Sequence, residues 1–138
     1  MTEENYRIEL LKVLNQEKNS IISRINSFLQ KIPQEAVRVN IIIFPGQDGE
    51  GEFTIHGGLN GPNLYTLNKK VEDWTQIFDV KCGPNGYEPK IPIVDPHSID
   101  YYVNDIIKEI CTKWINDNWN LLDTSKVKVA ISIYSDHI

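Results

Sequence analysis

The chain has 138 residues and a mass of 15.9 kDa, which is the length of one domain and leaves no room for a second hydrophobic core. Hydrophobic residues make up 41% of the chain and charged residues 24%, a composition that excludes a disordered or fibrous protein. The net charge of −5 argues against binding to nucleic acid or to an anionic membrane, because contacts with phosphate need Lys and Arg.

The first residues show no secretory signal pattern, and the longest apolar run, residues 41–44, is far too short to cross a bilayer. We therefore expect a cytoplasmic protein. Cys82 and Cys111 lack a second cysteine at the spacing of a zinc or thioredoxin-like motif, so we expect two reduced, buried thiols.

A long helix is predicted for residues 2–32. Thr2 is a suitable N-cap, and Pro33 ends the pattern. Apolar residues recur at steps of three and four, with one interruption at Lys18: Leu11, Leu14, Ile21, Ile25, Phe28 and Ile32. This stripe favours packing on a sheet of the same chain, and a coiled-coil dimer through the helix is the alternative.

A β-hairpin is predicted next, from a strand over residues 37–44 and a strand over residues 52–56. The glycine-rich segment between them supplies the turn. Residues 64–67 are a short candidate third strand. Asn68 is a suitable cap for a short helix whose apolar side chains would be Val71, Trp74, Ile77 and Phe78.

The segment 82–96 contains four prolines, which exclude regular helix and favour an ordered, extended coil. Ser98 is the expected cap of a second long helix that runs to about residue 115, and residues 127–134 alternate as a half-buried strand. The prediction is a single α+β domain over residues 1–138, with two long helices and a short one on an antiparallel or mixed sheet of about four strands.

The densest polar cluster, residues 47–52, lies at the tip of the predicted hairpin and contains Asp48, Glu50 and Glu52. Alternate carboxylates of this kind can bind a hard cation, but the ligand spacing of an EF-hand is missing. A solvated turn or a contact surface for a basic partner fits the pattern better. A cation at this loop remains an open alternative.

A second acidic surface is expected along the last helix, where Asp100, Asp105 and Glu109 join Asp117 on a polar side. The aromatic residues nearby suit either the core or a protein interface: Tyr101, Tyr102, Trp114 and Trp119. We take the first three carboxylates, together with those of the hairpin tip, as candidate partner-binding residues.

Few residues suggest catalysis. His56, His97 and His137 are the only histidines, and no two of them have the spacing of a helical zinc site. Asp95 beside His97 could orient an imidazole as a general base, although Asp and His before a helix usually serve as caps. No serine nucleophile motif, phosphate-binding loop, metal site or cofactor motif is recognised.

Three further stretches carry a resemblance: residues 44–51, residues 59–68, and residues 92–96 followed by Val103, Asn104, Asp105 and Trp114. Together they resemble an uncharacterised family of small bacterial proteins over most of the chain, and this resemblance implies no catalytic residue set. In general type, the small acidic α+β chain is also similar to immunity proteins of polymorphic toxin systems.

We therefore expect a non-enzymatic bacterial binding protein, of which an immunity protein that neutralises a basic toxin domain is the most specific form. Two alternatives stay open. One is a small enzyme or metal-dependent protein that uses Asp95 and His97, with His56 as a further group. The other is a dimeric assembly domain.

Overall fold

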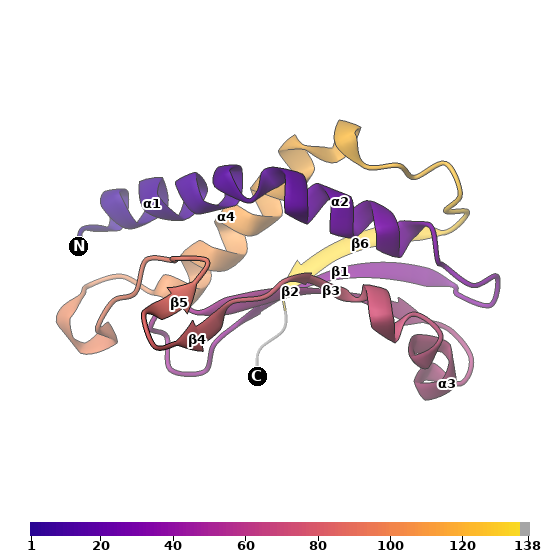
Figure 1. The fold of residues 1–138 in the computed structure, drawn as a ribbon, viewed down its shortest axis with the longest axis horizontal. Helices are drawn as coiled ribbons and strands as arrows, with labels where there is room; N and C mark the ends of the chain where they lie inside the picture. The colour runs from indigo at the N-terminus through magenta and orange to yellow at the C-terminus, as the bar shows by residue number, and fades with distance from the viewer. Residues whose placement is uncertain (136–138) are drawn as a thin grey trace.

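The computed structural model describes residues 1–135, and His137, considered above as a possible metal ligand, therefore lies outside the described residues. Three helices cover one face of a mixed four-stranded sheet (Figure 1). The order of its strands is β3 (Gln76–Phe78), β2 (Phe53–Asn60), β1 (Arg38–Pro45) and β6 (Ala130–Ser135). The helices are α1 (Glu3–Gln16), α2 (Lys18–Leu29) and α4 (Val103–Asp117). The predicted single α+β domain with a mixed sheet is confirmed.

The predicted first helix is two helices, because Glu17 leaves helical geometry with φ −95° and ψ 9°. Thr2 caps α1 as expected, with its Oγ1 accepting from the Asn5 N–H at 3.1 Å. The break changes which side chains face the core. Leu10 is buried, whereas Leu11, which the regular spacing placed on the apolar stripe, is 43% exposed.

The predicted hairpin is confirmed. Strand β1 (Arg38–Pro45) pairs antiparallel with β2 (Phe53–Asn60), with Ile43 opposite Ile55. The second strand is longer than expected because Gly57 and Gly58 continue it. A Cβ at Gly57 would lie 2.6 Å from a ring carbon of Phe28, so glycine lets α2 approach the sheet closely.

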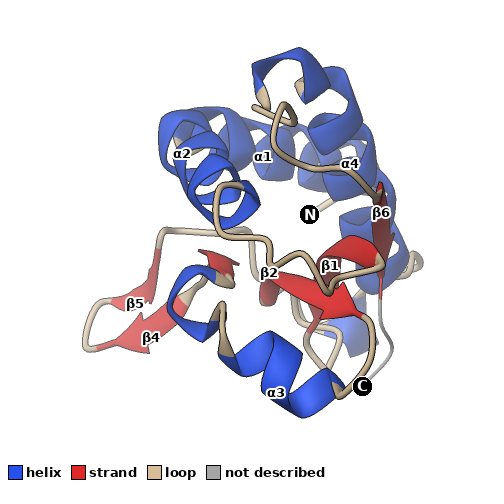
Figure 2. Cartoon of the chain, turned by 90° about the vertical axis from the view of Figure 1, so that its right-hand side faces the viewer, coloured by secondary structure: helices blue, strands red, loops and turns tan. Residues whose placement is uncertain are grey.

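The next segment was predicted wrongly. The expected third strand is a short helix, α3 (Leu64–Lys69), which lies on the opposite side of the sheet from the other helices (Figure 2). The expected helix to residue 78 contains only the 3-10 turn η1 (Glu72–Trp74) and the edge strand β3 (Gln76–Phe78). Ile77 and Phe78 are buried by pairing with β2 and packing in the core, which a helical spacing pattern cannot reveal.

Asn68 explains part of this difference. It lies inside α3 rather than at a cap, and its side chain bonds both backbone groups of Leu59 on β2, at 2.9 and 3.0 Å. The amide thus acts as a partner for the strand backbone where β3 does not reach.

The proline-rich segment contains a small separate hairpin, β4 (Lys81–Gly83) with β5 (Gly86–Glu88), where coil was predicted. The predicted Ser98 cap is also wrong. Asp95 caps the 3-10 turn η2 (Pro96–Ser98), and α4 begins later, after Tyr102, which makes no side-chain capping bond.

The last strand, β6 (Ala130–Ser135), follows the 3-10 turn η3 (Trp119–Leu121) and pairs in parallel with β1, so that Ile133 lies opposite Ile41. Most apolar side chains of β1, β2 and the three covering helices join one buried cluster between the helices and the sheet. In the described part of the chain, no helix is long and apolar enough to span a membrane.

Candidate functional site: an acidic cavity beside the start of helix α4

Turn geometry presents the tip of the β1–β2 hairpin to solvent. Gly49 and Gly51 have φ values of +68° and +125°, which side chains with a Cβ adopt rarely. The turn leaves Asp48 exposed and Glu50 half-buried. The tip is held in place because the Val94 N–H donates to the Glu50 carbonyl at 2.8 Å.

Glu52 is half-buried like Glu50, but its carboxyl group is packed within the hairpin. Its carboxyl group lies against Gly46, where a built Cβ would come within 2.4 Å of Oε1, and its Oε2 is buried without a hydrogen-bond partner among the described residues. Of the three candidate carboxylates of the hairpin, Glu52 therefore supports the turn, and the other two remain open to a partner.

The hairpin tip forms one wall of the candidate site, and the segment that enters α4 forms the other. Asp95 holds η2, with its carboxylate accepting from the His97 N–H at 3.0 Å and from the Ser98 hydroxyl at 2.9 Å. Tyr101 then donates its hydroxyl to the Met1 carbonyl at 2.8 Å, which ties this segment to the start of α1. The chain entering α4 is thus fixed at both ends.

One side-chain bond joins the two walls. The Asn104 amide, in the first turn of α4, donates to the Gly46 carbonyl at the base of the hairpin at 2.9 Å. Between the walls lies a cavity of about 350 Å³, lined by Gly49, Pro96, Ile99, Asp100, Tyr101, Tyr102, Val103 and Asn104. The candidate residues Asp100, Tyr101 and Tyr102 therefore line a cavity that Gly49 of the hairpin tip, about fifty positions earlier in the chain, also borders.

One carboxylate residue, Asp100, lines this cavity, and Asp48 and Glu50 are the chain neighbours of its lining residue Gly49. Asp48, Asp100 and Asp105 are exposed, and Glu3 begins α1 close by. We call these residues, together with Glu50, the acidic end of the molecule; it lies at the left in Figure 1, with the N-terminus and the start of α4.

Nearby carboxylates contribute to the raised pKa of two tyrosines, Tyr87 and Tyr101. The pKa of Tyr87 on β5 is raised by the carboxylate of Glu52 first, then by burial, by Cys82 and by the carboxylates of Glu50 and Asp48. Burial raises the pKa of Tyr101, and the carboxylates of Asp100 and Glu3 add to this effect. The carboxylates of the hairpin therefore act on Tyr87, and those of Asp100 and Glu3 act on Tyr101.

Glu109 differs from the other candidates on α4. It accepts from Arg7 at 2.5 Å, and Arg7 also bonds Glu3 at 3.1 Å, so one guanidinium partly balances the charges of both Glu109 and Glu3. Among the aromatic candidates, Tyr102 is 81% exposed at the cavity, whereas Trp114 is 3% exposed and belongs to the core. The aromatic contribution to this site is therefore made by Tyr101 and Tyr102.

The residues considered for catalysis do not form a site. Asp95 meets His97 through the backbone N–H of that residue, as a cap does. His56 lies on β2 with its ring edge-on to Phe44, at a centroid distance of 5.7 Å. No group of three or more His, Cys, Asp or Glu within residues 1–135 is arranged to hold a metal ion.

The two cysteines differ in exposure. Cys111 is buried in the core, as expected, and burial strongly raises the pKa of its thiol. Cys82, on β4, is exposed, so its predicted burial is wrong. The reason is that the β4–β5 hairpin stands apart from the main sheet, with no second layer over this strand.

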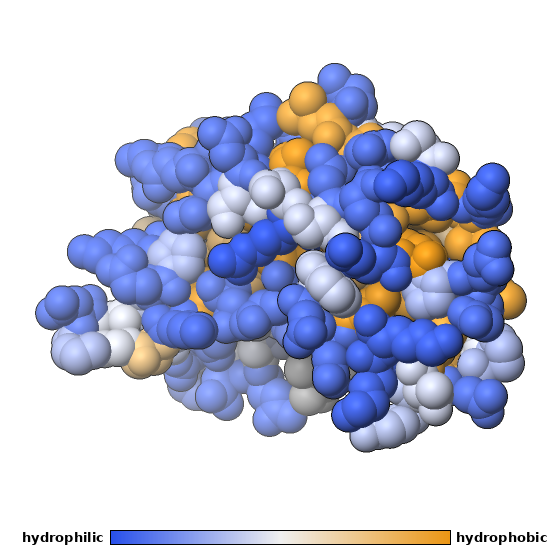
Figure 3. Space-filling view, turned by 45° about the vertical axis from the view of Figure 1, so that its right-hand side comes forward, coloured by the Kyte–Doolittle hydropathy of each residue, from blue (hydrophilic) through white to orange (hydrophobic). Residues whose placement is uncertain are grey.

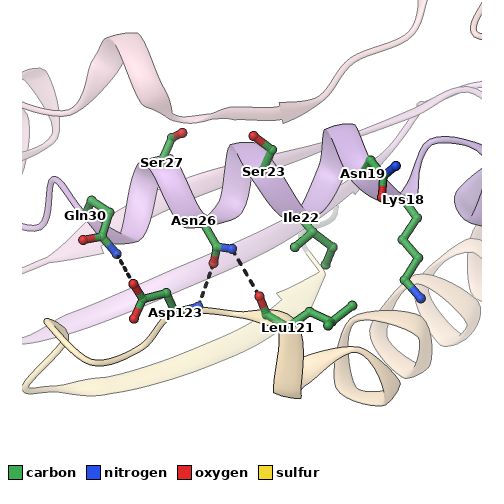
Figure 4. A pocket seen from close by; sticks show the side chains of 9 residues that line it. All are labelled: Lys18, Asn19, Ile22, Ser23, Asn26, Ser27, Gln30, Leu121 and Asp123. Atoms are coloured by element: carbon green, nitrogen blue, oxygen red, sulfur yellow. Dashed lines mark hydrogen bonds between the residues drawn. The ribbon is translucent and has the colours of Figure 1, made fainter.

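A larger groove of about 610 Å³ runs beside α2 and the chain after η3 (Figure 4). Asn26 spans it, donating to the Leu121 carbonyl at 3.1 Å and accepting from the Asp123 N–H at 2.7 Å. Gln30 donates to Asp123 at 3.1 Å. These polar groups already satisfy one another, so the groove is a seam between elements rather than a reactive site.

Sequence reasoning identified Asp48, Glu50, Asp100 and Asp105, together with the neighbouring Tyr101 and Tyr102, but neither Glu3 nor the cavity. Gly49, Pro96 and Ile99 line the cavity, and their residue types are ordinary for turns. The Asn104–Gly46 bond that brings the walls together is a tertiary contact without a local signal in the chain.

Comparison with known proteins gives the family but no relative of known activity. No curated protein and no solved structure matches the chain. A family model described as a family of unknown function (DUF6389) matches residues 1–137, and the chain therefore belongs to that family.

Proposed function

We propose that the protein is a non-enzymatic binding protein that covers a basic partner with its acidic end, as an immunity protein covers a toxin domain. The observation that carries this proposal is the shared cavity, where Asp100 and Tyr102 from the entry to α4 face Gly49 of the hairpin tip. A chain of net charge −5 attracts such a partner at long range.

The chemistry of the cavity suits a Lys or Arg side chain. Its volume of about 350 Å³ is large enough for one long side chain, and the tyrosine rings offer faces for a cation. The exposed Asp100 in its lining and the exposed Asp48 next to Gly49 add charge that accelerates association. The bacterial origin and cytoplasmic location that an immunity protein implies belong to this proposal.

The two other candidate functions have less support. The enzyme alternative needs Asp95, His97 and His56 in one pocket, and these residues occupy a capping turn and a strand of the sheet. A dimer through the first helix needs an unoccupied apolar stripe, and the buried side chains of α1 and α2 are packed within the chain.

The test is co-expression with the product of a neighbouring gene, followed by affinity purification and measurement of the association rate. The double variant Asp48→Lys and Asp100→Lys should slow association by at least about tenfold, because steering by charge acts mainly on this rate. Both side chains are exposed, so the fold should be retained.

A matched control is the double variant Glu72→Lys and Asp73→Lys, which makes the same charge change at exposed positions on η1. It should bind nearly as the wild type does. Equal losses in both double variants would mean that only net charge matters, and the absence of any basic partner would contradict the proposal.

A further inference from the structure

The second edge of the four-stranded sheet is open at β6. This strand pairs with β1 on one side, and no other segment within residues 1–135 pairs with it. Natural proteins usually protect such an edge with charges, prolines or bulges. The six residues of β6, AISIYS, contain no charge and no proline.

A groove with both polar and apolar lining residues accompanies this edge on the helix side. It has a volume of about 470 Å³ and is lined by Thr112, Asn116, Trp119, Ile131 and Ile133. The two isoleucines are only half-buried, although they point to the same side as the core residues of β1. An unpaired backbone edge beside a groove for alternate side chains is the arrangement used in strand addition.

We propose that the occupant is β6 of a second copy of this chain, paired antiparallel about a twofold axis perpendicular to the sheet. Such an axis keeps the helix-covered faces of both copies on the same side. Ile131 and Ile133 of each copy would then meet those of the other beside the two grooves. The pairing is apolar against apolar, and no like charges within the strands oppose each other.

The charges near the two ends of β6 favour antiparallel pairing of the two copies of this strand. The strand starts near exposed basic side chains, Lys128 just before it and Arg38 opposite Ala130. It ends level with Ile43, after which β1 continues to Pro45 and the chain enters the hairpin tip that carries Asp48. Antiparallel pairing therefore places the basic start of each strand towards the acidic end of the other copy.

The surface area that the interface can bury sets the expected stability of the dimer. A stable interface takes roughly 800 Å² from each partner, about a tenth of the 8090 Å² that this chain exposes. One six-residue edge with a shallow groove is a modest part of such an area. We therefore expect a dimer whose population depends on protein concentration. This inference does not depend on the proposed partner of the acidic end.

The test is light scattering coupled to size exclusion over a range of concentrations. The mass should rise from the 15.9 kDa of one chain towards twice that value. Ile133→Lys should keep the chain monomeric, because an inward-pointing Lys blocks edge pairing. Ile8→Lys on α1, which replaces an isoleucine that is 54% exposed, is the control and should dimerise normally.

Two further measurements guard against a variant that does not fold. Lys128→Glu, at an exposed position, should weaken the dimer roughly two- to fivefold, as expected for loss of exposed charge pairing. In the wild type, hydrogen exchange at the amides of β6 should slow as concentration rises. A wild type that stays monomeric at millimolar concentration, a dimer that survives Ile133→Lys, or a dimer lost in Ile8→Lys would overturn the proposal.

Discussion

At the scale of single residues, two buried positions show how closely the core is packed. Gly57 has no space for a side chain because the ring of Phe28 occupies that volume. Tyr6 is fully buried, and its hydroxyl has no hydrogen-bond partner among the described residues. Each feature predicts how a small substitution, which adds a methyl group at Gly57 or removes the hydroxyl of Tyr6, changes the free energy of unfolding.

Gly57→Ala should destabilise the protein by about 1–3 kcal/mol, the usual cost of forcing an extra carbon into a packed core. Phe28 is 0% exposed and cannot move aside easily. The control is Gly58→Ala, where the nearest atom is the terminal Cδ1 of the half-buried Ile42 at 3.1 Å. Denaturant unfolding should show a much smaller loss for Gly58→Ala, and equal losses would contradict the close approach of α2.

Tyr6→Phe should leave the free energy of unfolding at neutral pH unchanged or raise it by up to about 1 kcal/mol, because it removes a buried hydroxyl that has no partner. The same variant should change the pH dependence. Burial first, then Cys111, Tyr101 and Glu52, raise the pKa of Tyr6 above its ordinary 10.0. The folded state therefore disfavours the ionised form of this hydroxyl. The free energy of unfolding is unaffected by its titration below pH 10 and falls as the pH rises further.

Each such group contributes at most about 1.4 kcal/mol per pH unit to this loss. Unfolding measured between pH 9 and 11 should therefore show a shallower decline for Tyr6→Phe than for the wild type. In the variant, Cys111, whose pKa is also raised, still causes part of the decline in the free energy of unfolding. Tyr65→Phe, which changes a tyrosine that is 78% exposed, should retain the full decline; a shallower decline there would count against this account.

At the scale of elements, side-chain amides connect segments that backbone pairing does not reach. Asn68 joins α3 to the end of β2, and Asn26 joins α2 to the chain after η3. Each amide both donates to and accepts from main-chain groups. These bonds replace the ladder bonds that an additional strand would supply.

Asn68→Ala should lower the free energy of unfolding by about 1–3 kcal/mol, because it leaves backbone groups of Leu59 without partners. Lys69→Ala, at the exposed neighbouring position, should change it by no more than about 0.5 kcal/mol. Hydrogen exchange offers a local readout: the Leu59 amide should exchange faster in Asn68→Ala alone. Unchanged exchange there would show that the amide bonds are not what holds α3 to the sheet.

At the scale of the whole molecule, the helices and the sheet share one core, and the surface seen in Figure 3 is mainly hydrophilic with separate hydrophobic patches. Elements from both ends of the chain contribute to this core. The central strand β1 pairs with β2, which follows it directly, and with β6, the last strand.

We therefore expect one cooperative unfolding transition, as is usual for a small domain with a single core. Helix content measured by circular dichroism and tryptophan fluorescence should give coincident denaturant curves, because Trp114 reports on the core and Trp74 on the β3 side. Two separated transitions would contradict a single domain over residues 1–138.

Much of the fold could be predicted from local patterns. The alternation along β1 and β6, the capping residue Thr2 and the turn glycines each act over a few residues. The segment 64–78 could not be predicted, because Asn68 bonds β2 rather than capping a helix and Phe78 is buried by strand pairing. Spacing alone does not distinguish a short buried strand from a helical turn.

The sequence by itself determined the single acidic α+β domain, the hairpin and the types of residue at the acidic end, because composition, period and turn chemistry are local properties. Only the tertiary structure decided which charges act together. It buried the Glu52 Oε2 atom, paired Glu109 with Arg7, and brought Gly49 of the hairpin tip and Asp100 to one cavity. Such choices depend on contacts between distant segments, like that of Asn104 with Gly46, which form only when the helices pack on the sheet.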